Sequence, residues 1–309
     1  MQTRAFDLVS LGEAMVEFNQ ASPSQAQFLQ GFGGDTSNAV IAAARAGART
    51  AYLTRIGADS FGRLLLQLWT QEGVHTSGVS TASASHTGSY FVTHGSQGHE
   101  FSYMRADSAA SRMTPQWLAG TPTNLIRDAR FLHLSGITLA LSAGACDTGF
   151  EAMEAAREAG TKVSFDANLR LKLWPLARAR ACITHAVSLC DLFMPSLEDM
   201  MVLIGLSDPD AIIDWSHDKG AGIVVLKLGS EGARVSDGRH RETIPARHVT
   251  VRDATGAGDC FCGNLLARLA KGDDLLHAAA YANAAAALSV QGFGAVAPMP
   301  RSNSVFAVL

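Results

Sequence analysis

The sequence predicts an α/β protein in which a mostly parallel sheet is flanked by helices. Short apolar runs typical of buried strands alternate with longer helical stretches, and turns marked by Gly, Asp or Pro separate them. The length of 309 residues suits one large domain or two small ones. Because no internal repeat, low-complexity tract or linker divides the chain, we expect a single domain over residues 1–309.

The expected strands are short runs rich in Val, Leu, Ile and Phe. The last two expected strands lie in the C-terminal third, follow each other closely and are predicted to pair. In chain order the expected strands are Phe6–Gly12, Thr50–Ile56, Phe131–Leu134, Lys162–Phe165, Asp191–Met194, Gly222–Leu228 and the pair Ala233–Asp237 and Arg239–Ile244.

The expected helices are the longer segments between these strands, several of them rich in Ala. Glycines mark the ends of the first two, at Gly47 and Gly73, as is common at a helix C-terminus. In chain order the expected helices are Thr36–Gly47, Ser60–Glu72, Ala145–Ala159, Leu176–Leu189, Ser196–Leu203, Pro209–Lys219, Ala257–Ala270 and Leu275–Val290.

Two segments break the strand–helix alternation. Val16–Phe32 is loop-like and rich in Gln, whereas Ser85–Met104 alternates polar and apolar residues around a Gly95–Gly98 turn, as a β-hairpin does. On this pattern alone, they are predicted to be an ordinary exposed loop and hairpin.

Composition narrows the classes of function. A hydrophobic fraction of 47% is ordinary for a globular protein, and a net charge of −3 gives no electrostatic case for nucleic acid or anionic membrane as a partner. No apolar run approaches the roughly 20 residues needed to span a bilayer, and the polar start Met1–Asp7 has no signal-peptide pattern. Five cysteines without CxxC spacing favour reduced thiols in a cytoplasmic protein over a zinc site.

The most informative motif is Asp253-Ala254-Thr255-Gly256-Ala257-Gly258-Asp259, which lies where a loop becomes a helix. The first N–H groups of a helix have no intrahelical partner, and small residues let an anion approach them closely. Asp259 follows this phosphate cradle, where it is suited to take a proton from an attacking hydroxyl. The alternative is a helix-capping carboxylate after a Gly-rich turn. Neither a Walker A sequence nor a dinucleotide-binding G-x-G-x-x-G after a strand is present.

This motif resembles the C-terminal signature of the ribokinase-like (PfkB) family of ATP-dependent sugar kinases. A second block, Gly31 to Gly47, resembles the family's N-terminal signature and lies about two hundred residues upstream, in the family's order. The resemblance implies that Asp259 is the catalytic base and that Gly256, Ala257 and Gly258 form the anion cradle. It also implies that Val16–Phe32 and Ser85–Met104 form a small β lid over the sugar.

The resemblance also implies a set of sugar-binding residues. Gly34, Asp35 and Asn38 lie in the N-terminal signature, and an aspartate after Gly-Gly is similar to the 2-keto-3-deoxygluconate kinase branch. Glu100–Ser111 resembles that branch's segment in which an aromatic hydroxyl and an arginine reach the substrate. An Arg fork suits a carboxylate, although an Arg on a hairpin is also a common surface residue. The implied sugar-binding residues are Gly34, Asp35, Asn38, Tyr90, Tyr103, Arg105, Arg170 and Asp259.

On the nucleotide side, the stretch Asp166–Trp174 follows a strand and is similar to one shared by 2-keto-3-deoxygluconate kinases and fructokinases. The alternative for Arg170 is a structural ion pair with Asp166. Ser196 replaces the family's Asn in its N-x-x-E motif, leaving Glu198 to act on Mg²⁺ through water; Ser196 with Asp199 also fits a helix cap. The implied nucleotide-binding residues are Asn168, Ser196, Lys227, Gly229, Gly232, Gly256, Gly258 and Asn283.

The resemblance implies phosphorylation of 2-keto-3-deoxygluconate by MgATP, with fructokinase or another sugar kinase as the alternative and a non-catalytic sugar- or nucleotide-binding regulator as a further one. It leaves open the sugar epimer, the nucleotide donor and a monovalent-cation requirement. Family relatives often pair their lids in a dimer, so we expect a homo-oligomer whose half-apolar lid face carries Tyr90, Phe91 and Phe101.

Overall fold

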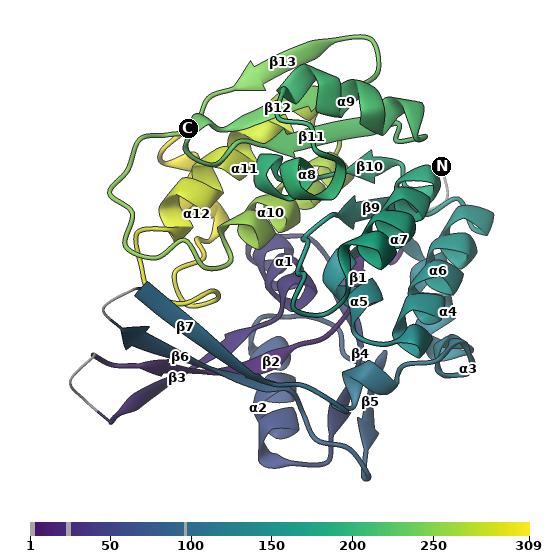
Figure 1. Cartoon of the computed structure of the whole chain (residues 1–309), viewed down its shortest axis with the longest axis vertical. Coiled ribbons are helices and arrows are strands. Elements are labelled where there is room, and N and C mark those ends of the chain that lie inside the picture. The colour runs from purple at the N-terminus through teal and green to yellow at the C-terminus, as the bar shows by residue number, and fades with distance from the viewer. Residues whose placement is uncertain (1–3, 23–25, 96–97) are drawn as a thin grey trace.

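The structure confirms the predicted α/β architecture, in which a large, mostly parallel sheet is accompanied by a small second sheet (Figure 1). It is a computed structural model that describes residues 4–22, 26–95 and 98–309. In the described part of the chain, no helix is long and apolar enough to cross a bilayer. The large sheet and its helices form the body of the molecule, and the small sheet projects from one end of it (Figure 1).

The large sheet is parallel except at one edge, where its last two strands run antiparallel. All the strands expected from the sequence are present in it, and one further strand, Val79–Ala82, extends the other edge. Its spatial order is β13 (Arg241–Ile244), β12 (Ala233–Ser236), β11 (Ile223–Lys227), β10 (Leu192–Phe193), β9 (Lys162–Asp166), β8 (Ala129–Ser135), β1 (Phe6–Leu11), β4 (Thr50–Gly57) and β5 (Val79–Ala82).

The helices include every one expected from the sequence, with ends that agree to within about two residues. The additional ones are short and lack the length that makes a helical pattern readable. In chain order the helices are α1 (Asp35–Arg45), α2 (Ser60–Gln71), α3 (Pro115–Leu118), α4 (Thr121–Arg127), α5 (Gly136–Ala140), α6 (Ala143–Glu158), α7 (Leu176–Leu189), α8 (Leu197–Ile204), α9 (Pro209–Asp218), α10 (Ala257–Lys271), α11 (Leu275–Ser289) and α12 (Ser302–Phe306).

The large sheet is buried on both faces. On β1, Leu8 belongs to the core cluster that contains side chains of α10 and α11, whereas its neighbour Val9 belongs to the separate cluster that contains side chains of α6 and α7. Successive side chains of a strand point to opposite faces, so a strand covered on both sides reads as a continuous apolar run. This explains why these strands were recognisable in the sequence.

The small sheet has the order β3 (Phe28–Gly33), β2 (Met15–Gln20), β6 (Ser89–Gly95) and β7 (Gly98–Met104). The hairpin predicted for Ser85–Met104 is confirmed, because β6 and β7 pair antiparallel. Of the two alternatives for Val16–Phe32, the exposed loop was wrong and the β structure implied by the family resemblance is confirmed, since this segment contributes most of β2 and β3. β2 pairs in parallel with β6, more than sixty residues away. The hydrogen bonds of this long-range pairing stabilise β2, and the local sequence pattern does not reveal them.

The two faces of the small sheet differ, which corrects the expectation that Tyr90, Phe91 and Phe101 share an exposed face. Tyr90 is only 5% exposed and packs against Phe101 on one face. Phe91, the next residue along β6, lies on the opposite face and stacks on Phe18. Adjacent residues of a strand cannot share a face, so the expected grouping was impossible for a strand in this register.

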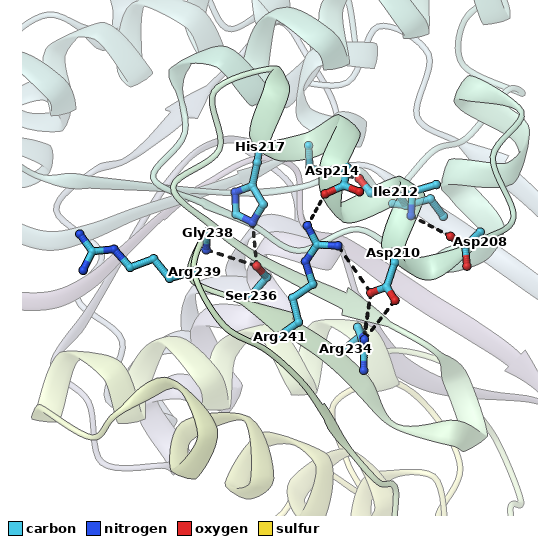
Figure 2. A network of polar contacts seen from close by, with 12 residues as sticks. Asp208, Asp210, Ile212, Asp214, His217, Arg234, Ser236, Gly238, Arg239 and Arg241 are labelled. Carbon is cyan, nitrogen blue, oxygen red and sulfur yellow. Dashed lines mark hydrogen bonds and ion pairs between the residues drawn. The ribbon is translucent and has the colours of Figure 1, made fainter.

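The antiparallel edge of the large sheet is held to α9 by ion pairs (Figure 2). Arg234 of β12 contacts Asp210, and Arg241 of β13 contacts both Asp210 and Asp214. Next to these ion pairs, His217 Nε2 and the Ser236 hydroxyl form a hydrogen bond of 2.8 Å. Exposed ion pairs contribute little stability individually, typically below about 1 kcal/mol, so this network orients the edge strands rather than holding the fold.

Candidate functional site

A cavity of about 1020 Å³ lies where the carboxyl ends of β9, β10 and β11 meet the small sheet and the start of α10. Binding sites of open α/β sheets are found at this end of the strands. Most of the residues predicted from the sequence line it. They are Gly34, Asp35, Asn38, Tyr90, Tyr103, Arg105, Asn168, Arg170, Ser196, Glu198, Lys227, Gly229, Gly256, Ala257, Gly258 and Asp259.

The Gly-Ala-Gly turn opens α10 with no side chain capping the helix. Gly256 has φ of +74°, and a Cβ there would lie 2.9 Å from the Cβ of Ala295. Only glycine tolerates both constraints without strain. The helix N-terminus therefore faces the cavity with its positive dipole end uncovered, and this arrangement favours an anion.

Asp259 lies half-buried in the cavity wall, and Asn38 donates a hydrogen bond of 2.8 Å to its Oδ2. Removal from water and the nearby charge of Asp35 raise the pKa of Asp259 to about 7, against smaller opposing effects of the Asn38 hydrogen bond and the Lys227 charge. A carboxylate with a pKa near neutrality accepts a proton more readily than an ordinary aspartate. The alternative of a simple helix-capping role is not supported, because no side-chain cap is formed.

Asp35 and Asn38 open α1 on another side of the cavity. Asn168 donates to Asp35 Oδ2 at 2.9 Å, and burial raises the pKa of the Asp35 carboxyl. Asp35 Oδ1 and Asn38 Oδ1 are buried with no hydrogen-bond partner in the described part of the protein. Unpartnered buried acceptors are costly, so these two oxygens are suited to receive hydrogen bonds from hydroxyl groups of a ligand. Asn168 was expected near a nucleotide, and that contact stays a prediction; in the structure it donates to Asp35.

The small sheet contributes aromatic rings. Tyr90 and Tyr103 lie opposite each other on β6 and β7, with ring centroids 5.6 Å apart. The Tyr90 hydroxyl donates to Glu17, so its proton is already engaged, whereas its oxygen remains able to accept. The Tyr103 side chain is 43% exposed and therefore accessible from the cavity.

Arg105, which follows β7 directly, is already ion-paired. Its Nε donates to Glu13 Oε2 at 2.8 Å, its Nη2 lies 2.6 Å from the same oxygen, and Ser108 also donates to Glu13. Glu13 is fully buried, lines the cavity and was missed by the sequence analysis. The signal that could have found it is its position directly after the buried strand β1. The guanidinium is thus fixed in orientation and part of its charge is balanced.

Arg170 is half exposed, and its Nη1 lies 3.9 Å from Asp199. The alternative in which Arg170 pairs with Asp166 was wrong, because Asp166 is paired with Lys227 at 2.6 Å. Asp166 ends β9 and also accepts from the backbone of Asn168, which has a positive φ of 30°. Of the two arginines that line the cavity, Arg170 is therefore the more exposed and the more loosely paired.

Ser196 and Glu198 lie at the start of α8. The Ser196 hydroxyl accepts from the backbone N–H of Asp199 at 3.1 Å, which confirms the predicted helix cap. Glu198 faces the cavity from the first turn. Across the described ranges, no three His, Cys, Asp or Glu side chains are grouped closely enough to hold a metal ion. A cation here would need oxygens supplied by water and by a ligand.

Gly232 and Asn283 do not line this cavity. The Asn283 amide donates to the carbonyl oxygens of Ile244 and Pro245, at 2.9 and 3.3 Å. Gly232 has φ of +103°, and a Cβ there would lie 2.1 Å from the Ile244 oxygen. Both residues hold the segment that follows β13. Their predicted contacts with a nucleotide stay predictions.

Comparison with known proteins places this geometry in a family. The chain is 34% identical to a 2-dehydro-3-deoxygluconokinase of Thermoproteus tenax, over 95% of this chain and 92% of the relative. It is 31% identical to a probable fructokinase-4 of Arabidopsis thaliana, over 98% and 96%. A solved structure of a putative ribokinase II from E. coli, in complex with ATP and Mg²⁺, is 25% identical with a TM-score of 0.89, and the match covers 97% of both chains.

The family model of the pfkB carbohydrate kinases matches residues 5–302, which include both sheets and the whole cavity. The two signatures recognised in the sequence therefore lie within one matched domain. This chain belongs to the pfkB family of carbohydrate kinases.

Proposed function

We propose that this sugar kinase phosphorylates the terminal hydroxyl of 2-keto-3-deoxygluconate (2-dehydro-3-deoxygluconate), with ATP as the donor and 2-keto-3-deoxy-6-phosphogluconate as the product. The observation that carries the proposal is that two arginines, Arg105 and Arg170, line the same cavity as Asp259 and the Gly-Ala-Gly turn. A planar guanidinium fork matches a carboxylate, which a sugar acid has and a neutral sugar lacks. The similarity to 2-dehydro-3-deoxygluconokinases supports the same substrate class.

In the proposed reaction, Asp259 accepts the proton of the terminal hydroxyl while that oxygen attacks the γ-phosphorus of ATP. Asp35 and Asn38 orient the sugar through their unpartnered oxygens, and the open N-terminus of α10 stabilises the negative charge that develops on the phosphoryl group. Phosphoryl transfer depends mainly on such positioning and electrostatic stabilisation.

Glu198 lines the cavity, and among the described residues it is not grouped with two other side chains that could ligate a metal directly. Its carboxylate therefore fits a role in holding Mg²⁺ through water. When bound with ATP, Mg²⁺ neutralises phosphate charge. The ATP- and Mg²⁺-bound structural relative supports this use of the metal. A monovalent cation remains a separate prediction.

Fructokinase is the second candidate, favoured by one specific observation. Glu13 already balances the charge of Arg105, at 2.6 Å, so the cavity offers a less positive site than two free arginines would. The hydroxyl-binding group of Asp35, Asn38 and Asn168 serves a neutral sugar equally well. The similarity to plant fructokinases agrees with this alternative.

Release of ADP, measured with a coupled assay, tests the proposal against these alternatives. The acceptors are 2-keto-3-deoxygluconate, fructose, ribose and adenosine, each at the same concentration, with a reaction lacking any acceptor as the control. We expect ADP release to depend on the sugar acid. Equal or faster release with fructose would favour the fructokinase, and no release above the control with any acceptor would indicate a non-catalytic regulator.

The reaction is expected to require the ionised form of Asp259. Because the pKa of Asp259 is raised to about 7 in the free protein, the carboxyl is protonated and unable to accept a proton at lower pH. Consequently kcat/KM should fall about tenfold for each pH unit below 7 and level off above it. A kcat/KM profile that stays flat from about pH 8 to pH 5 would contradict the role of Asp259 as base.

The small sheet is expected to close over the sugar as a lid. Tyr90, Tyr103 and Arg105 belong to or directly follow its strands and line the cavity, so a bound sugar contacts it directly. Backbone amides of residues 85–104 should exchange hydrogen more slowly at saturating sugar. Residues 96–97 lie outside the described residues. Exchange that does not change with sugar would show that this sheet is not a lid.

The protein is also expected to form a homo-oligomer through this sheet. Leu29 and Tyr103 lie on the same face of the small sheet and expose 61% and 43% of their surface, and exposed apolar side chains commonly mark an interface. Light scattering should give a mass of at least twice 32.6 kDa. Replacing Leu29 with Ser should lower the mass toward that of one chain. A concentration-independent monomer of the unaltered protein would contradict this interface.

A further inference from the structure

Lys227 is the last residue of β11, and its ammonium group reaches the first turn of α10. A Cβ built on Gly258 would lie 3.5 Å from Lys227 Nζ, so no side chain separates this nitrogen from the Gly-Ala-Gly turn. The Lys227 side chain is 14% exposed and lines the cavity. A full positive charge therefore stands beside the uncovered positive end of the α10 dipole.

Asp166 holds the ammonium in this place. Its Oδ2 accepts from Lys227 Nζ at 2.6 Å, and the thiol of Cys262 lies 3.7 Å from the same nitrogen. An ammonium group has three donors. The strong bond to Asp166 uses one of them, and a thiol is a weak acceptor, so donor capacity is left for a ligand in the cavity.

Lys227 keeps its charge despite its surroundings. Burial is the largest single effect and would lower the pKa of Lys227, but the charge and hydrogen bond of Asp166, together with the charges of Cys262 and Asp199, outweigh burial and raise this pKa. Three carboxyl groups of the cavity lie close enough together for their charges to repel one another. They belong to Asp35, Asp166 and Asp259. A polyphosphate brought to Asp259 would be repelled by these carboxylates unless a cation stood next to it.

We propose that Lys227 contacts the transferred phosphoryl group of ATP and stabilises the charge that develops on it, with Asp166 as the residue that positions the ammonium. This rests on the kinase reaction proposed above. The sugar oxygen forms a bond to the γ-phosphorus, the bond from that phosphorus to the bridging oxygen of ADP breaks, and Asp259 takes the hydroxyl proton. Lys227 retains its protons throughout and acts by charge and hydrogen bonding.

The competing explanation is that Lys227 only balances the buried charge of Asp166. Three variants separate the two: Lys227→Met, Asp166→Asn and the double variant, which replaces the ion pair with neutral groups of similar size. A buried ion pair exchanged for neutral residues often leaves stability little changed, whereas removing one partner leaves an unpaired charge. Thermal unfolding of the double variant should therefore remain close to that of the unaltered protein.

The activity of the double variant decides between the explanations. If Lys227 contacts the phosphoryl group, Lys227→Met should lower kcat by about 10²–10³-fold with the best acceptor, and the double variant should stay as low. Recovery of the double variant to within about threefold of the unaltered kcat would overturn the proposal, because only the charge balance of Asp166 would then matter.

A binding measurement separates this proposal from the choice of sugar. Calorimetry without sugar should show that Lys227→Met weakens ATP binding by about tenfold or more but leaves adenosine binding unchanged, because adenosine has no phosphate. Equal loss for both ligands would indicate a structural role and would contradict the proposal. Lys162→Met is the matched control: Lys162 forms a 2.7 Å ion pair with Asp191 at the opposite end of β9, and its loss should change neither affinity.

Discussion

Replacement of Asp259 with Asn should lower kcat by about 10²–10⁴-fold, the usual contribution of general-base catalysis. The amide is nearly the same size as the carboxylate and can keep a hydrogen bond with Asn38, which now donates to Asp259 at 2.8 Å. It cannot accept the proton of the attacking hydroxyl. The open N-terminus of α10 is unaltered, so ATP should still bind with nearly unchanged affinity in a calorimetric titration.

The same variant should be more stable than the unaltered protein at pH 8. The pKa of Asp259 is about 7 in the folded protein, above the value of about 3.9 for an unperturbed aspartate. The stability contributed by the neutral carboxyl is present below the unfolded pKa and lost as pH rises through 7, whereas Asn stays neutral. The gain in Tm should therefore disappear near pH 4.

The kinetic result decides the catalytic role. If Asp259→Asn kept more than about a tenth of the unaltered kcat, Asp259 would be excluded as the base.

Replacement of Arg105 with Ala should reduce kcat/KM for 2-keto-3-deoxygluconate by roughly 10–150-fold, the effect of losing a charge-assisted hydrogen bond. The effect on fructose should be much smaller, because fructose has no carboxylate for the guanidinium to bind. Initial rates with both sugars, measured on one preparation of the variant, give the two values.

Comparing the two sugars separates the loss of carboxylate binding from the structural effect of removing Arg105. Without Arg105, the buried carboxylate of Glu13 loses the ion pair that now lies at 2.6 Å, and this cost falls on both reactions equally. Arg112→Ala, a change in the same segment with a half-exposed side chain outside the cavity, is the matched control and should change neither value. An equal loss with both sugars would make Arg105 structural and favour the fructokinase alternative.

Most of the fold was predictable because its strands are buried on both faces. Such strands read as continuous apolar runs, as β11 does, and their alternation with helices indicates a parallel sheet. β2 and β3 were expected only from the family resemblance, because their stability comes from pairing β2 with β6 far along the chain and not from a local pattern. The grouping of Tyr90 with Phe91 failed because adjacent residues of a strand point to opposite faces.

The candidate site was predictable where a local motif carries the chemistry. The Gly-Ala-Gly turn and Asp259 depend on a helix N-terminus, which the sequence specifies within a few residues. Glu13 was missed because its role arises from contacts with Arg105 and Ser108, more than ninety residues away. The pairing of Asp166 with Lys227 joins two strand ends in the same way and was likewise not visible in the sequence.

A competition experiment tests the substrate assignment most directly. Equal concentrations of 2-keto-3-deoxygluconate and fructose are incubated with limiting ATP, and mass spectrometry quantifies the two phosphorylated products. Their ratio equals the ratio of the two kcat/KM values, whatever the absolute activity of the preparation. We expect the phosphorylated sugar acid to exceed the phosphorylated fructose by about tenfold or more, the discrimination that one charge-assisted bond provides. An excess of fructose phosphate would contradict the assignment.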